Sequence, residues 1–179
     1  MNDCSTPSQP REHVVSLRGG RSATIRYVQA ADRSGFEDAF ARLSPRSRYT
    51  RFFSPLRELS PSLLDAATQV QPDQSVAIVA VDGEGVNADI VGGARYAYKP
   101  DSPSCEFAVT VADNWQGLGL ARQLMEALIS LARAQGLQRM EGYVLPDNHG
   151  MRQLASRLGF VDTVCPGDRS LRLVSLDLG

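Results

Sequence analysis

The segment Asn114–Arg122, which reads N-W-Q-G-L-G-L-A-R, constrains the fold more than any other part of the sequence. It follows the strand-like run Cys105–Val111 and opens a long amphipathic helical pattern. A strand, a glycine turn and a helix in this order bring free backbone N–H groups and the positive end of the helix dipole to one point. The sequence therefore predicts an anion-binding loop between a central strand and a helix.

The spacing of the glycines separates several kinds of loop. The dinucleotide fingerprint G-x-G-x-x-G requires a third glycine where Arg122 stands, and it leaves no room for the five residues 112–116 between strand and glycine. A phosphate-binding P-loop ends in G-K-[ST], which is absent. The pattern that remains is Gln116-x-x-Gly119-x-Ala121. An ordinary strand-to-helix turn without a ligand is the alternative.

Three segments in the order of a known family resemble the GNAT N-acetyltransferase superfamily. Residues 106–121, E-F-A-V-T-V-A-D-N-W-Q-G-L-G-L-A, are similar to its motif A, which contains the loop for the coenzyme A pyrophosphate. Residues 144–160, V-L-P-D-N-H-G-M-R-Q-L-A-S-R-L-G-F, are similar to its motif B. Residues 42–53, R-L-S-P-R-S-R-Y-T-R-F-F, resemble the branch that holds bacterial protein-lysine acetyltransferases. The resemblance covers residues 12–176 and implies acetyl-CoA as co-substrate, without a metal.

This resemblance also implies which residues bind acetyl-CoA. The pyrophosphate would accept backbone N–H groups at the helix start, and the pantetheine arm would pair with the strand as an extra strand does. Arg122 would add charge or be a solvated helix residue, and Asn148 would contact the arm or simply cap a helix. The expected binding residues are Val109, Thr110, Val111, Gln116, Gly117, Leu118, Gly119, Leu120, Ala121, Arg122 and Asn148.

Glu106 is the candidate catalytic base. An acceptor amine with a pKa near 10.4 is almost fully protonated at neutral pH and must lose a proton before it attacks a thioester. Strand alternation places Glu106 on the face opposite Phe107 and Val109, where its carboxylate can take that proton directly or through a water. The resembling family carries a glutamate at the matching place. The alternatives are an exposed strand-edge glutamate and an ion pair with Arg95.

A dedicated general acid is not evident in the sequence. Many members of the family carry a tyrosine seven residues after the motif B asparagine, but Ala155 stands there. Tyr143 is a substitute, although an aromatic residue in a strand more often packs. The thiol of coenzyme A, with a pKa near 8.5 by analogy with cysteine, can leave as a thiolate. Covalent catalysis through Cys105 is disfavoured, because His13 and His149 are distant in the sequence.

Composition is that of an ordinary globular chain. A net charge of −1 gives no basic footprint for nucleic acid or anionic membranes, and no apolar run reaches the roughly 20 residues of a membrane span. Three cysteines far apart suit a reducing, cytoplasmic environment, and no signal peptide is evident. We expect a loose tail at residues 1–11 and a single domain at 12–179, with a homodimer left open.

Hydrophobic periodicity predicts alternating strands and helices. The pattern indicates an α+β fold with a mixed, mostly antiparallel sheet and helices on both faces, in three α/β/α layers. The expected strands are 13–17, 23–28, 75–81, 90–98, 105–111, 138–145 and 171–176. The expected helices are 32–43, 45–53 and 61–68, one that ends at Gly136, and one between Asn148 and Gly159.

The acceptor is less constrained than the acetyl donor. The resemblance to the protein-acetylating branch implies a lysine on a protein, while a small amine remains an alternative. A regulatory domain that senses acetyl-CoA without turnover is a second class of function, which Glu106 and the intact loop disfavour. Arg46, Arg48 and Arg51 would either steer an acidic partner or be solvated.

Overall fold

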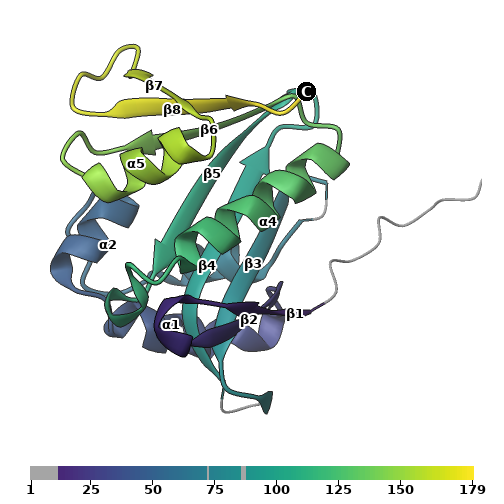
Figure 1. Ribbon diagram of the computed structural model, residues 1–179, viewed down its shortest axis with the longest axis vertical. Coiled ribbons are helices and arrows are strands. Elements are labelled where there is room, and N and C mark those ends of the chain that lie inside the picture. The colour runs from purple at the N-terminus through teal and green to yellow at the C-terminus, as the bar shows by residue number, and fades with distance from the viewer. Residues whose placement is uncertain (1–11, 72, 86–87) are drawn as a thin grey trace, which may run out of the picture.

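The computed structural model describes residues 12–71, 73–85 and 88–179, which form a layer of helices on each face of a central sheet (Figure 1). The sheet has eight strands in the order β1-β2-β3-β4-β5-β6-β8-β7. β5 and β6 are parallel, and the other neighbouring strands are antiparallel. This arrangement confirms the predicted α+β fold class. The loose tail predicted for residues 1–11 lies outside the described residues.

Strand and helix boundaries follow the predicted ones within a few residues, except that the short edge strand Val161–Val164 was not predicted. The strands are β1 (His13–Ser16), β2 (Ser22–Tyr27), β3 (Ser75–Asp82), β4 (Asp89–Tyr98), β5 (Ser104–Val111), β6 (Arg139–Val144), β7 (Val161–Val164) and β8 (Arg172–Asp177). The α-helices are α1 (Arg33–Ala41), α2 (Pro45–Phe52), α3 (Pro61–Thr68), α4 (Leu120–Ala134) and α5 (His149–Arg157). Short 3-10 turns are η1 (Arg18–Gly20), η2 (Ala30–Asp32) and η4 (Asp113–Trp115).

The two helical layers contact different strands of the sheet. α4 crosses β3, β4 and β5 on one face, and α5 lies on the same face beside the β6–β8 end (Figure 1). α1, α2 and α3 cover the opposite face, where α1 contacts β4 and α2 contacts β5. β5 therefore runs between a helix that begins at the predicted anion loop and a group of short helices that precedes it in the chain.

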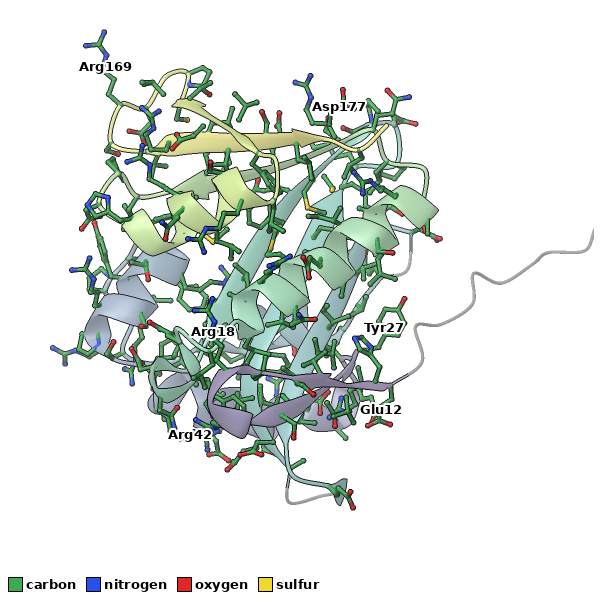
Figure 2. The ribbon with its side chains drawn as sticks, in the orientation of Figure 1. Glu12, Arg18, Tyr27, Arg42, Arg169 and Asp177 are labelled. Atoms are coloured by element: carbon green, nitrogen blue, oxygen red, sulfur yellow. The ribbon has the colours of Figure 1, made fainter. Side chains whose placement is uncertain are left out.

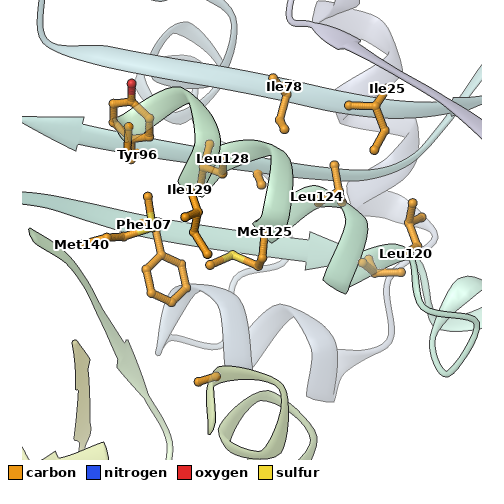
Figure 3. Packing of buried hydrophobic residues seen from close by; sticks show 14 of the residues in the cluster. Ile25, Ile78, Tyr96, Phe107, Leu120, Leu124, Met125, Leu128, Ile129 and Met140 are labelled. Atoms are coloured by element: carbon orange, nitrogen blue, oxygen red, sulfur yellow. The ribbon is translucent and has the colours of Figure 1, made fainter. Parts of the chain in front are cut away.

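The main core forms between α4 and the sheet. Leu120, Leu124 and Leu128 are fully buried and point toward the strands (Figure 3). Gly92 on β4 allows α4 to come close, because a Cβ at this position would lie 3.2 Å from both Leu124 Cδ1 and the Thr110 carbonyl oxygen. The apolar stripe predicted for α4 is therefore the face that fixes the helix, and the loop before it, against the sheet.

Short local signals begin the two helices α2 and α3. Ser44 and Ser60 each accept a hydrogen bond from the backbone N–H three residues later, and a proline occupies the first helical position after each. The Ser-Pro pair at each start is itself a helix signal, because a serine oxygen satisfies an unpaired N–H and proline has none to lose. Among the described residues, no helix is long and apolar enough to cross a membrane.

Candidate functional site

The sheet opens beside Glu106. β5 and β6 pair only from Ser104–Glu106 to Arg139–Glu141, and beyond this point the strands diverge (Figure 1). The ring of Phe107 fills the divergence, since a Cβ on Gly142 would lie 2.5 Å from its Cε1 atom. Gly142 on β6 therefore makes room for the aromatic ring that separates the strands. In the described part of the chain, the β5 backbone from Phe107 onward has no strand partner on this side, so its groups at Phe107 and Val109 are available to a ligand.

The predicted anion loop lies at the far end of the same strand. Gly117 and Gly119 have φ values of 75° and 98°, and a Cβ on either would point into open space. Within the described residues, the backbone N–H groups of residues 117–119 donate to no protein acceptor. The first N–H groups of α4, at Leu120 and Ala121, lack an intrahelical partner, as at any helix start. These groups form a cradle that fits a phosphate or pyrophosphate.

Two of the predicted loop residues act inside the protein rather than toward a ligand. The Gln116 side chain donates from Nε2 to the Val111 carbonyl at 3.2 Å and to Ser47 Oγ at 3.3 Å, and its backbone N–H donates to the Asp113 carbonyl. The side chain of Leu120 is fully buried in the core. Both residues shape the loop and leave phosphate contacts to the backbone.

Positive charge beside the loop comes from the turn between β1 and β2, which joins two of the expected strands. Arg18 donates its backbone N–H to the Leu118 carbonyl at 3.0 Å, and its exposed side chain lies beside the start of α4 (Figure 2). Arg21 lies 3.5 Å over the Trp115 ring and donates to the Asn114 carbonyl at 3.0 Å. Arg122 forms an exposed pair with Glu126 at 2.8 Å, within its own helix. Residues 18–21, R-G-G-R, carry no local sequence signal of the contacts that Arg18 and Arg21 make with residues 114–118.

Glu106 occupies the face that strand alternation predicted. Its side chain is exposed, while Cys105 and Phe107 are buried on the opposite face. Its register neighbours are Ala97 on β4 and Glu141 on β6. No ion pair joins Glu106 to Arg95 in the described part of the chain, so that alternative is not supported. The carboxylate is open to solvent at the point where the strands part.

Tyr143 lies on the same sheet face as Glu106. The parallel register places it two residues beyond Glu141 on β6, and its side chain is 41% exposed. Local burial and then the charge of Glu106 raise the pKa of the Tyr143 hydroxyl. Its exposure argues against the interpretation of Tyr143 as a packing residue and brings a hydroxyl near the candidate base.

Neither Cys105 nor Ala155 offers chemistry at this opening. Cys105 is 2% exposed on the opposite face of the strand, and burial raises the pKa of its thiol to about 12. A thiol that stays protonated is a poor nucleophile at neutral pH. Ala155, at the place where many relatives of the resembling family carry tyrosine, is fully buried.

Asn148 begins α5 at the other side of the opening. Its Oδ1 accepts a hydrogen bond from the Met151 backbone N–H at 3.1 Å, which confirms the predicted N-cap. The preceding residue, Asp147, pairs with Arg46 of α2 at 3.6 Å. α2 and the start of α5 therefore meet across the open end of the sheet. A contact between Asn148 and the pantetheine arm stays a prediction.

α2 is fastened to the anion loop. Asp113 accepts hydrogen bonds from the Ser44 backbone N–H at 2.9 Å, from Ser44 Oγ at 2.9 Å and from Ser47 Oγ at 2.7 Å. Burial alone would raise the pKa of Asp113, but these hydrogen bonds outweigh it and lower the pKa. The helix on the acceptor side and the candidate phosphate loop are therefore connected through one carboxylate.

Two of the three arginines of this helix, for which steering of an acidic partner or solvation was left open, are partly buried against the protein. Arg48 donates to the carbonyls of Leu43, Ala41 and Arg57 and lies over the Phe40 ring. Arg51 is half-buried and lines a cavity of about 190 Å³ between the sheet and α1–α3. Only Arg46 is largely exposed. The alternative of solvated side chains is not supported for Arg48 and Arg51, because backbone carbonyls engage Arg48 and because Arg51 lines the pocket beneath α2.

The fold and the site can now be compared with known proteins. Residues 38–160 match the family model described as the Acetyltransferase (GNAT) family. The chain is 41% identical over 155 residues to Acetyltransferase PA5475 from Pseudomonas aeruginosa, which covers 87% of this chain and 83% of that protein. It is 33% identical over 148 residues to Acetyltransferase Pat from Mycolicibacterium smegmatis, with 82% of this chain covered. That match spans 44% of the length of Pat.

Similarity in structure agrees with similarity in sequence. The GNAT domain of S. lividans PAT superposes with a TM-score of 0.84 at 25% identity and covers 93% of this chain and 96% of its own. The family match extends from α1 to Phe160, and so includes the opened strands, the anion loop and the start of α5. The chain belongs to the GNAT family of acetyltransferases.

Proposed function

We propose that this acetyltransferase moves the acetyl group of acetyl-CoA directly to a primary amine, with Glu106 as the general base. The observation that carries the proposal is the position of the Glu106 carboxylate, exposed where β5 and β6 separate. The loop at residues 117–121 supplies backbone donors for the pyrophosphate at the other end of β5. The β5 edge at Phe107 and Val109 supports pairing with the amide-rich pantetheine arm between these two points.

The reaction needs one proton acceptor before the bond is made. Glu106 takes a proton from the acceptor ammonium, and the freed nitrogen lone pair attacks the thioester carbon. The C–N bond forms, the C–S bond breaks, and the electron pair leaves with sulfur as the thiolate. The nitrogen gives up its second proton as the amide forms, and the thiolate or the solvent takes this proton up. Since a coenzyme A thiol is acidic, with a pKa near 8.5 by analogy with cysteine, this departure needs no strong acid. Tyr143 is the hydroxyl on this face that could protonate the thiolate afterwards.

Two classes of acceptor have support. The relatives named Pat and PAT favour the lysine of a protein, as the sequence comparison with the protein-acetylating branch implied. The cavity beside β5 favours a small amine, because its volume of about 190 Å³ and its mostly apolar lining suit a small molecule. A domain that only senses acetyl-CoA would not need a carboxylate exposed at the strand opening.

A mass-spectrometric acceptor screen tests this function. The full chain is incubated with acetyl-CoA and either free amines and amino acids or lysine-containing proteins, and a mass increase of one acetyl group is scored. Initial-rate lines for the acceptor found should intersect, because direct transfer requires both substrates to be bound together, whereas a covalent enzyme intermediate gives parallel lines. Tight binding of acetyl-CoA with no acceptor modified would support the sensing function and contradict the proposal.

A further inference from the structure

The cavity under α2 is apolar apart from two arginines. Most of its lining comes from aliphatic and aromatic side chains of α1, α2, α3, β3 and β4, among them Phe36, Phe40 and Ile90. Arg51 of α2 and Arg95 of β4 are the charged residues that line it. The name "arginine cavity" is used below for this space. An apolar wall with two cations is an unusual environment that calls for a negatively charged partner.

Among the residues that the structure describes, neither guanidinium group has a hydrogen-bonded carboxylate partner. In the described ranges, Arg51 forms no hydrogen bond or ion pair and only stacks on Phe52, 4.8 Å from the ring centre. Arg95 donates one hydrogen bond, from Nη1 to the Ala66 carbonyl at 2.7 Å. Burial, and then the charge of Arg95, lower the pKa of Arg51 to about 10, so the group is still charged at neutral pH. Two unpaired cations held together in a poorly solvated space favour an anionic ligand.

The arginine cavity lies directly beside the candidate base. Ala108 and Thr110 line it, and alternation along β5 places Glu106 on the same face, two residues before Ala108. The negative charge of Glu106 acts to raise the pKa of Arg51, yet no ion pair within 4.0 Å joins the two side chains among the described residues. Glu106 on β5 can attract an ammonium group, and Arg51 and Arg95 can attract a carboxylate. These opposite charges therefore lie beside the same stretch of β5.

The size of the space limits the ligand. A cavity of about 150 Å³ lined by apolar side chains is known to admit benzene, and the arginine cavity has about 190 Å³. The apolar part of its ligand is therefore comparable to the side chain of methionine, leucine or phenylalanine. A lysine side chain that entered this space would bring its ammonium toward two positive charges.

We propose that the arginine cavity binds the carboxylate and side chain of the acceptor, and that the acceptor is a free amino acid with a neutral, apolar side chain. The carboxylate pairs with Arg51 and Arg95, whose planar groups suit two-point binding of a carboxylate. The amino group is then directed to Glu106 and to the thioester. This inference rests on the proposed function and names the substrate class for the same site.

L-Methionine and L-methioninamide provide a direct test in the wild-type protein. They share the amine and the side chain, but only the acid offers a carboxylate. The amide has the more easily deprotonated amine, so chemical reactivity alone would favour it. We expect kcat/KM for the acid to exceed that for the amide at least tenfold. Equal use of both, or acetylation of protein lysines with neither probe modified, would overturn the proposal.

Variants that remove one positive charge test whether the preference for acid over amide arises in the arginine cavity. Arg51→Met and Arg95→Met should each reduce the preference for acid over amide to less than threefold, with the KM for acetyl-CoA unchanged. Arg57→Met is the matched control, because Arg57 lies on the same helical face of the protein, is exposed and does not line the cavity. Retention of the full preference in both cavity variants would overturn the assignment. Circular dichroism spectra are compared first, and Arg51→Gln or Arg95→Gln, which also removes the charge, replaces a methionine variant that does not fold.

A binding measurement separates this inference from the transfer reaction. N-Acetyl-L-methionine has the carboxylate and side chain but no reactive amine. It should raise the melting temperature of the wild type and of Arg57→Met, but not of Arg51→Met. Binding without any turnover would leave the cavity assignment intact and contradict the proposed function. Turnover of methionine without a preference for the carboxylate would support the proposed function and contradict the cavity assignment.

Discussion

Gly117 and Gly119 contribute to the candidate phosphate site through their backbone. Their φ values of 75° and 98° are costly for residues with a Cβ, so a substitution such as Gly119→Glu would strain the loop before any ligand is bound. A loss of affinity in that variant would mix folding with binding. Arg18 offers a cleaner test, because its side chain is exposed and only its backbone is used in the fold.

Replacement of Arg18 with glutamate should weaken acetyl-CoA binding about tenfold, since it places a negative charge beside the phosphates. Isothermal titration calorimetry measures the change. The melting temperature should stay the same, because exposed substitutions away from specific contacts have small effects. Arg169→Glu, an exposed charge change in the β7–β8 loop (Figure 2), is the control and should bind normally. Equal affinity in both variants would show that the β1–β2 turn does not face the phosphates.

At the scale of elements, the contact between α2 and the anion loop links the two substrate sites. Asp113 belongs to the short turn η4 before the loop and holds the N-terminus of α2 by three hydrogen bonds. Gln116 adds a fourth connection through Ser47. The candidate anion loop and the helix that carries Arg51 are therefore held together by side-chain hydrogen bonds.

Asp113→Asn should lower the melting temperature at neutral pH, because a neutral amide accepts these hydrogen bonds less strongly than a carboxylate. The folded-state pKa of Asp113 is lowered, so its contribution to stability is present above the unfolded pKa of about 3.9 and is lost as the pH falls through the folded value. The difference in melting temperature between wild type and variant should be constant above about pH 5 and shrink below pH 4. Thermal scans at several pH values, with Asp101→Asn as the exposed control, measure it. A difference that grows on acidification would contradict this role.

The order of strands and helices could be predicted because each carries its own local signal. The apolar stripe of α4 and the Ser-Pro starts of α2 and α3 are examples. β7 was missed, since Val161 and Val164 are exposed and the strand has only four residues on the edge of the sheet. Its pairing with β8 depends on the tertiary fold rather than on its own pattern.

The candidate site could also be predicted only where its features are local in the sequence. The backbone loop and the face of Glu106 followed from a motif and from strand alternation, which are local properties. The roles of Arg18 and Arg51 were not predictable, because each depends on elements distant in the sequence that meet only in the fold. The Gln116 side chain fits a loop motif equally well whether it faces a phosphate or, as found here, a carbonyl of the preceding strand.

For the whole molecule, the central sheet separates the two parts of the reaction. The anion loop leads into α4 on one face, and the arginine cavity lies under α1–α3 on the other. β5 belongs to both, since its backbone edge is open toward β6 and its even-numbered residues face the cavity. Glu106 is the carboxylate of this strand, and it lies where the strands part. In the proposed mechanism, transfer between the two substrates depends on this carboxylate.

The most direct test is a parallel measurement of turnover and acetyl-CoA affinity in Glu106→Gln. Glutamine keeps the size of the side chain but cannot accept the proton, so turnover should fall roughly 10²–10⁴-fold while the dissociation constant for acetyl-CoA stays within twofold of the wild type. The control Glu141→Gln changes the neighbouring carboxylate on β6 and should keep most of the activity. Normal turnover in Glu106→Gln at neutral pH would contradict the assignment of Glu106 as the base and leave it as a surface residue of the strand.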